Sequence, residues 1–272
     1  AGEYNTHIYA YDNLENGKCI GTQKVTIPMV KITYDENYVK DGTTNKQTVE
    51  KVYNTELGTL GTPTRTGYTF AGWFTETAGG AQISSTTKTP VTDTTYYAHW
   101  NANPLNFANQ TISKTFSTSE QKADITVASN GTGNYTYTEK TEKNASGTAT
   151  NYISISGTTI NIAASTPAGT YTYVITAKDN NSGVTKDATY TINVARAKNA
   201  SASASNKTYN GKSQTGVTGS GITWSGTTSG IDAGTYTATA TPDGNHAWSD
   251  GTTGAKTITW TMNKMTVAVT WG

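Results

Sequence analysis

The 272-residue sequence is poor in several residue types, and each shortage excludes a class of protein. It has one cysteine, Cys19, which rules out the internal disulfide framework that staples many small secreted domains. No apolar run reaches the roughly eighteen residues of a membrane-spanning helix, and residues 1–5 have neither the basic nor the apolar region of a signal peptide. We therefore expect a fragment that does not insert into a membrane, with any secretion signal or anchor outside it.

Charged residues are also scarce. They make up 14% of the chain, and the net charge is only +1. Affinity for nucleic acid depends on clustered Lys and Arg that neutralise phosphates, and no basic run occurs here, so no nucleic-acid partner is expected. Thr, Ser, Asn and Gly fill the gap, and these residues favour turns, caps and strands over long helices.

What the sequence does contain is one strand pattern after another, each with a period of two. In residues 170–177, the side chains of Tyr171, Tyr173 and Ile175 point one way and threonines mostly point the other. The same alternation recurs at 188–194, 236–240, 258–262 and 265–271. Asn-Gly and Asp-Gly pairs separate such segments and indicate turns. The pattern predicts an all-β fold of half-buried antiparallel strands, without helices.

Polar joints divide the chain into four expected segments. Residues 1–28 are predicted to form a hairpin, and residues 29–102, 103–196 and 197–272 are predicted to form three small modules. A lone hairpin is only marginally stable in water. It is therefore expected either to pack on the first module or to be the tail of another one.

Three motifs connect the first module to a known family. They are VKITYD at 30–35, PTRTGYTFAGWF at 63–74 and TTYYAHW at 94–100. Their order resembles the Listeria–Bacteroides repeat, also called the internalin B-repeat, of bacterial surface proteins. One departure is that Glu36-Asn37-Tyr38 replaces the Asn-Gly-Gly that commonly follows the first strand. The resemblance implies a small β-grasp-like module in a bacterial envelope.

The two later modules resemble other bacterial surface repeats. The segments ISISG at 153–157 and PAGTYTY at 167–173 are similar to immunoglobulin-like, cadherin-like modules, and KTYNGKSQ at 207–214 with DAGTYTATA at 232–240 is similar to the MBG family. These resemblances imply two Ig-like β-sandwiches. Residues 263–269 read like residues 197–202, so they are either the first strand of another copy or a simple last strand.

No constellation of residues indicates catalysis. The three histidines, His7, His99 and His246, lack the short spacing of metal pairs, and the oxygen-rich loop 179–183 lacks the ligand pattern of calcium loops, so we expect an ordinary turn there. Cys19, in a predicted strand without a basic partner, is expected to be a packed small residue. We predict no metal, no cofactor and no enzymatic activity.

Two candidate sites remain. Trp248, with Trp224 and Tyr209, is a candidate for stacking against sugar rings because a ring offers a flat apolar face; the alternative is that these aromatics belong to the core. Trp248 is favoured because it lies in a predicted loop. Lys114 and Asn193 are the candidate pair for an intramolecular Lys–Asn cross-link, although no acid partner is identified.

Together these features predict a non-enzymatic segment of a bacterial cell-surface protein, located outside the cell. It is expected to be monomeric and to act as an adhesin or as a stalk or spacer, with host or environmental glycans or matrix proteins as partners. The alternative is a carbohydrate-binding region of a surface glycan-utilisation protein.

Overall fold

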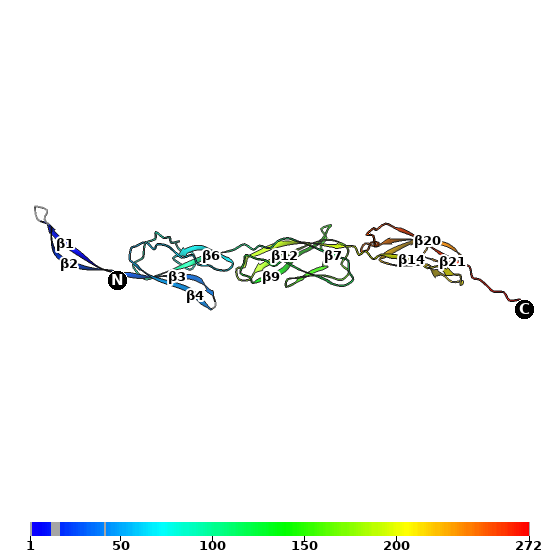
Figure 1. Ribbon diagram of the computed structural model, residues 1–272, viewed down its shortest axis with the longest axis horizontal. Helices are drawn as coiled ribbons and strands as arrows, with labels where there is room; N and C mark the ends of the chain where they lie inside the picture. The colour runs from blue at the N-terminus through cyan, green and yellow to red at the C-terminus, as the bar shows by residue number, and fades with distance from the viewer. Residues whose placement is uncertain (1, 12–16, 41, 272) are drawn as a thin grey trace. The chain divides into compact units, whose positions relative to one another are not determined.

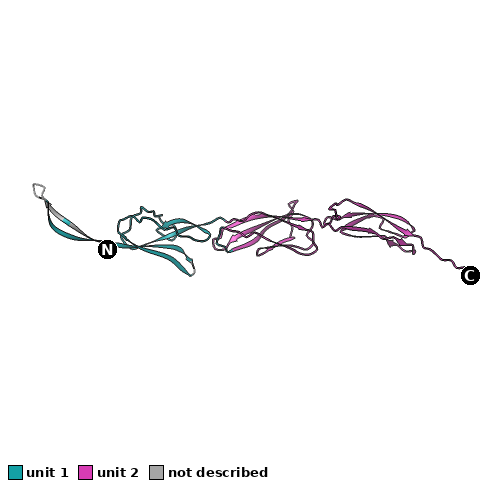
Figure 2. Ribbon diagram, in the orientation of Figure 1, with its two compact units in different colours: residues 1–104, 130–134 teal, residues 105–129, 135–272 magenta. Residues whose placement is uncertain are grey.

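The computed structural model describes residues 2–11, 17–40 and 42–271, and every secondary-structure element in them is a strand (Figure 1). The all-β prediction is confirmed. The chain divides into two compact units, one of residues 1–104 with 130–134 and one of residues 105–129 with 135–272 (Figure 2).

Unit 1 contains β1 (Gly2–Tyr11), β2 (Gly17–Ile27), β3 (Met29–Lys40), β4 (Thr43–Val52), β5 (Tyr68–Phe74) and β6 (Thr94–Ala102). Strands β1 and β2 form the predicted N-terminal hairpin as a separate two-stranded sheet. Its Ile20 and Val25 side chains are exposed, and the turn residue Asn16 lies outside the described residues.

The other four strands of unit 1 form one mixed sheet in the order β4-β3-β6-β5, which we call the repeat module. Its central strands, β3 and β6, run parallel, with Ile32 opposite Thr94. A central parallel pair flanked by two antiparallel strands is the β-grasp order that was expected. The core consists of Val30, Ile32, Tyr34, Leu57, Trp73, Ile83, Tyr96 and Ala98.

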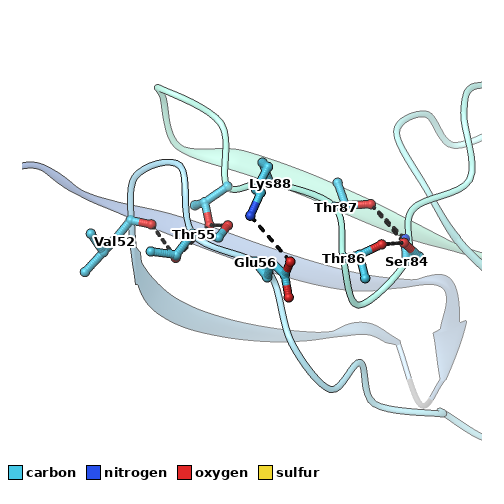
Figure 3. A network of polar contacts seen from close by, with 8 residues as sticks. Val52, Thr55, Glu56, Ser84, Thr86, Thr87 and Lys88 are labelled. Carbon is cyan, nitrogen blue, oxygen red and sulfur yellow. Dashed lines mark hydrogen bonds and ion pairs between the residues drawn. The ribbon is translucent and has the colours of Figure 1, made fainter.

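Two loops, rather than a helix, supply the second layer of the repeat module. Leu57 N donates to Thr87 O at 2.9 Å, and the Thr89 hydroxyl donates to Thr55 O at 2.7 Å. Figure 3 shows the polar contacts that join the loops, including Lys88 with Glu56 at 3.4 Å. That ion pair is exposed and contributes little stability. These hydrogen bonds join the loop that contains Leu57 to the loop that contains Ile83 and Thr87. The two loops thereby keep the Leu57 and Ile83 side chains in the core.

Unit 2 begins with the first sandwich, which contains β7 (Gln110–Thr115), β8 (Gln121–Asp124), β9 (Tyr135–Asn144), β10 (Ile153–Ser156), β11 (Thr159–Ile162), β12 (Gly169–Asp179) and β13 (Thr185–Ala195). One sheet has the order β7-β13-β12-β9 and the other β10-β11-β8. Seven strands split in this way, with the first strand parallel to the last, form an Ig-like topology.

The second sandwich contains β14 (Ser201–Ala204), β15 (Lys207–Thr208), β16 (Gln214–Thr215), β17 (Val217–Ser220), β18 (Ile222–Gly226), β19 (Ser229–Gly230), β20 (Gly234–Pro242) and β21 (Lys256–Asn263). Its main sheet, β15-β21-β20-β18, is accompanied by the pairs β14-β17 and β16-β19. The main sheet repeats the order of the first sandwich, again with an early strand parallel to the last.

A tyrosine hydrogen bond marks the same corner in both sandwiches. Tyr171 OH donates to Pro167 O at 2.8 Å, and Tyr236 OH donates to Asp232 O at 2.8 Å. In each case the tyrosine lies on the penultimate strand and reaches back four residues, as the tyrosine corner of Ig-like sandwiches does. The shared Ala-Gly-Thr-Tyr sequence at 168–171 and 233–236 therefore has one structural cause.

Hydrogen bonds within unit 2 also join the two sandwiches. Ala168 N donates to Asn245 Oδ1 at 2.8 Å, and Arg196 Nη1 donates to Asp243 O at 3.0 Å. His246 Nδ1 lies 2.6 Å from Asp243 Oδ1. Partial burial would raise the pKa of Asp243, but the hydrogen bonds from His246 and from Asn245 N outweigh it and hold that pKa below its usual value. Of these contacts, the hydrogen bonds from Ala168 and Arg196 connect the two sandwiches next to residues 195–197.

The alternating segment 265–271 forms no strand, so that expectation is wrong for this chain. Met265, Val267, Val269 and Trp271 are all exposed, Trp271 by 91%. Alternation makes a segment amphipathic, but a strand also needs a neighbour to pair its N–H and C=O groups.

The contact between Gly216 and Trp260 gives a test of the second core. A Cβ on Gly216 would lie 1.9 Å from the buried Trp260 ring, so Gly216→Ala is expected to lower the unfolding free energy of the second sandwich by about 1–3 kcal/mol. Gly234→Ala is the control because its Cβ would meet nothing within 4 Å. Denaturant-dependent hydrogen exchange of residues 197–263 measures both, and equal effects would contradict the packing.

Two tyrosines of the first sandwich provide a matched pair. Tyr190 is fully buried and its hydroxyl has no hydrogen-bond partner among the described residues; burial, with a smaller effect of Tyr137, raises the pKa of Tyr190 to about 12. Tyr190→Phe is expected to stabilise the first sandwich by about 1 kcal/mol, and Tyr171→Phe to destabilise it by about as much. Hydrogen exchange of residues 105–195 measures both changes. A loss in both variants would show that Tyr190 has a polar partner.

Candidate functional site

Arg65 is placed by a tight turn at the start of β5. Tyr68 N donates to Arg65 O at 3.1 Å, and the two residues form an antiparallel bridge. Gly67, the third residue of the turn, has a φ of 79°, which glycine adopts at little cost and which a type II turn requires at this position. The Arg-Thr-Gly-Tyr sequence therefore folds Arg65 back beside the strand that begins at Tyr68.

The guanidinium group of Arg65 lies among three aromatic rings. Its Cζ is 3.8 Å from the ring centroid of Tyr68, 4.8 Å from that of Tyr38 and 6.0 Å from that of Trp100. Cation–π attraction of this kind holds a guanidinium in place without neutralising it. Among the described residues, none forms an ion pair or a side-chain hydrogen bond with the guanidinium.

A surface pocket of about 460 Å³ opens beside this arginine, and we call it the Arg65 pocket. The rings of Phe74 and His99 stack with centroids 4.0 Å apart, and His99 Nε2 donates to Glu76 O at 2.9 Å. Of the described residues that line the pocket, Arg65 alone carries a formal charge. The lining residues are Asn37, Arg65, Ala71, Phe74, Thr77, Ala78, Gly79, Ala98, His99, Trp100 and Asn101.

Asn37 fixes one side of the pocket. It lies where the pairing of β3 with β4 shifts register, and its φ is 56°. Its side-chain Nδ2 donates to Thr77 O at 2.9 Å and to Ala98 O at 3.1 Å. Asparagine tolerates the left-handed conformation better than most residues, so Asn37 adopts it at this position with little strain. Its amide ties the loop at Thr77 to the sheet.

The aromatic residues predicted to bind sugars lie in the second sandwich. Contrary to the prediction, Trp248 is buried. Its side chain is 4% exposed and packs with Ala200 and Ala240, and its Nε1 donates to Gly254 O at 2.7 Å. Trp224 packs half-buried against the same cluster, whereas Tyr209 is 37% exposed and forms no ring contact with either tryptophan. A tryptophan in a loop is still drawn into the core because its large apolar area favours burial.

The structure does not bring Lys114 and Asn193 together. Lys114 is opposite Val194 in the parallel pair β7–β13, and Asn193 is opposite Ser113. Because side chains alternate between the faces of a sheet, the two point to opposite faces. Lys114 Nζ donates to Lys122 O at 2.7 Å, and Asn193 Oδ1 accepts from the Thr170 hydroxyl at 2.9 Å.

Cys19 was expected to be packed and to have no basic partner, and both expectations are wrong. Its side chain is exposed, and its Sγ lies 3.7 Å from His7 Nδ1 on the neighbouring strand. Residues 179–183 form the β12–β13 turn, in which buried Asp179 accepts from the main-chain N–H of Asn181. No three His, Cys, Asp or Glu residues in the described part of the chain gather in a way that suits a metal ion.

The sequence interpretation missed the residues of the Arg65 pocket. Arg65 and Tyr68 stand inside the motif at 63–74, and the Thr-Gly between them is a turn signal that returns the chain on itself. The turn signal could have predicted that Arg65 lies beside Tyr68. It could not have predicted Tyr38 and Trp100, because these come from β3 and β6 and only the parallel pairing of those strands places them beside the turn.

A comparison with known families gives a match within the repeat module. Residues 31–99 match the Listeria-Bacteroides repeat domain. This match supports the first resemblance that the sequence motifs carry. It covers the module that contains the Arg65 pocket.

Several solved structures align with the chain at low similarity. Drosophila N-cadherin EC1-4 is 11% identical with a TM-score of 0.30 and aligns over 96% of this chain and 83% of its own. The N-terminal four Ig domains of Dscam1 isoform 6.9 are 10% identical with a TM-score of 0.30 over 66% of this chain, which spans about half, 51%, of that structure. A SusE-like surface-located polysaccharide-binding protein from the Bacteroides thetaiotaomicron heparin utilisation locus is 13% identical, with a TM-score of 0.28 over 63% of this chain and 36% of its own.

These scores are too low to transfer any property to this chain. No curated protein sequence matches it with significance. Within the described residues there is no helix long and apolar enough to span a bilayer.

Substitution of Asn37 tests how the pocket is held. Asn37→Ala removes two hydrogen bonds and strains the backbone, so it is expected to lower the unfolding free energy of the repeat module by about 2 kcal/mol. Asn37→Gly removes the same bonds without strain and is expected to cost about 1 kcal/mol. Both variants are expected to increase hydrogen exchange at residues 75–80. Unchanged exchange there would show that the amide does not hold the loop.

Proposed function

We propose that this chain is a non-enzymatic segment of a bacterial cell-surface protein, located outside the cell, that acts as a stalk or adhesive spacer. The segment consists of three modules, at residues 29–102, 103–196 and 197–272. The second module resembles cadherin-like repeats and the third resembles MBG repeats. The match of residues 31–99 to a repeat domain supports the bacterial surface setting.

The observation that carries the proposal is a shared strand pairing. In each module a strand near the start of the module runs parallel to its last strand. These pairs are β3 with β6, β7 with β13 and β15 with β21. Each module also has a hydrophobic core of its own.

Parallel pairing suits a protein that is pulled at its ends. In the repeat module and the first sandwich, force enters at the N-terminal end of the early strand and leaves at the C-terminal end of the last, and in a parallel pair these are opposite ends of one ladder. The strands must then slide past each other, which loads all their hydrogen bonds together. In the second sandwich β14 precedes the early strand β15, so the force first acts on the antiparallel pair of β14 with β17. In an antiparallel pair the pulled ends are adjacent, and the bonds break one after another. A spacer that transmits tension benefits from the first arrangement.

A second candidate function is carbohydrate binding, and the Arg65 pocket favours it. The pocket combines aromatic rings, amide side chains and an arginine without an ionic partner in the described chain. Pockets that bind small polar molecules have this mixture of apolar walls and a few placed polar groups. This mixture supports the Arg65 pocket as the site for a glycan partner of an adhesive spacer.

Pulling single molecules from the two chain ends tests the spacer proposal. The parallel ladders contain six residue pairs in the first sandwich, four in the repeat module and two in the second sandwich. Unfolding forces are therefore expected to fall in that order, and each step is identified by its released length of about 3.5 Å per residue. A reversed order, or unfolding at negligible force, would contradict a load-bearing role.

The pulling direction supplies the control. Thr170 and Asn193 are register partners in the antiparallel pair β12–β13. Handles on Thr170→Cys and Asn193→Cys, in a Cys19→Ser background, peel the same sandwich apart instead of shearing it. We expect a lower force than end-to-end pulling gives, and an equal force would show that the parallel ladder bears no special load.

A further inference from the structure

The charge of the Arg65 pocket indicates the sign of its ligand. The guanidinium of Arg65 has no carboxylate partner among the described residues, and no other lining residue carries a formal charge. A planar guanidinium pairs with carboxylate or sulfate groups through two parallel hydrogen bonds. Its position against Tyr68 at 3.8 Å keeps it oriented before any ligand arrives, which reduces the entropy lost on binding.

The remaining lining indicates what carries the negative charge. Trp100, Phe74 and His99 provide apolar ring surface, and Asn101 and Thr77 provide hydrogen-bonding groups for hydroxyls. The volume of about 460 Å³ falls within the range of about 300–1,000 Å³ that small-molecule sites occupy. One arginine and a net charge of +1 do not suit a phosphate polymer, which needs several cations along its length.

We propose that the Arg65 pocket binds an acidic sugar of a polysaccharide, a uronic acid or a sulfated sugar, with its anionic group paired to the Arg65 guanidinium. The sugar ring lies against the aromatic wall, and its hydroxyl groups reach the amide side chains of the rim. This inference rests on the carbohydrate-binding candidate function and assigns its ligand class and its site.

Titration calorimetry with matched sugars tests the ligand class. Tri-galacturonate is compared with its methyl ester, which has the same rings without the charge, and sulfated dextran oligomers are compared with dextran. We expect an acidic probe to bind at least about tenfold more tightly than its neutral counterpart, since charge-assisted hydrogen bonds are the stronger ones. Equal binding of charged and neutral sugars would overturn the acidic class and leave carbohydrate binding in place.

Two sets of variants test the site. Arg65→Ala is expected to lose at least about tenfold in affinity, and Arg65→Lys is expected to lose part of that, because lysine keeps the charge without the planar fork. Lys88→Ala removes one positive charge from the loop network away from the pocket and is expected to bind as the original chain does. Circular dichroism and hydrogen exchange of the repeat module verify that each variant is folded.

Ala78 allows a test that leaves Arg65 intact. It is exposed on the rim of the pocket, so Ala78→Glu places a negative charge there, and Ala78→Gln places a side chain of the same size without charge. Ala78→Glu is expected to weaken binding of the acidic probe by several-fold and Ala78→Gln to leave it unchanged. Binding that is indifferent to both Ala78→Glu and Arg65→Ala would overturn the site. A lack of binding by all four probes would overturn the inference and the carbohydrate-binding candidate together, and would leave the spacer proposal standing.

Discussion

The parallel pairing of an early strand with the last strand is the constraint on which each module depends. It brings together residues about 60 to 80 positions apart, such as Ile32 with Thr94 and Ile112 with Ile192. Once this pair forms, the strands between its members are confined to the remaining edges and to the second layer. The sandwiches and the repeat module share this closure although their strand numbers and covering layers differ.

Tyrosine and tryptophan contribute large buried rings to the cores beside the aliphatic residues. Tyr173 and Tyr190 are fully buried in the first sandwich, and Trp260 is fully buried in the second. Each large ring also brings a polar atom that needs a partner when buried. Tyr171 and Tyr236 satisfy theirs on the corner carbonyls, so the same residues fill the cores and fix the corners. Tyr190 is an exception among the described residues, and its core position rests on apolar packing alone.

The Arg65 pocket is built on the closing strands of the repeat module. Asn37 comes from β3 and Trp100 from β6, and the turn that carries Arg65 leads into β5. Because the most constrained strands of the module supply the walls, the pocket is held without a helix or a metal-bound loop. The loop at Thr77 is joined to these strands by the Asn37 amide and by the hydrogen bond from His99 Nε2 to Glu76 O. The proposed binding site and the proposed load-bearing ladder of this module therefore share one strand pair.

The sequence by itself determined that the chain is all-β and which motifs match the repeat, because strand alternation and turn residues are local properties. The motifs at 153–173 and 207–240 also indicated two sandwiches, through their resemblance to Ig-like and MBG modules. Tertiary structure alone decided that Trp248 is buried, that Lys114 and Asn193 lie on opposite faces, and that residues 265–271 stay unpaired. It also decided that Arg65 meets Tyr38 and Trp100. Each of these depends on which distant strand becomes the neighbour, and side-chain periodicity does not encode that choice.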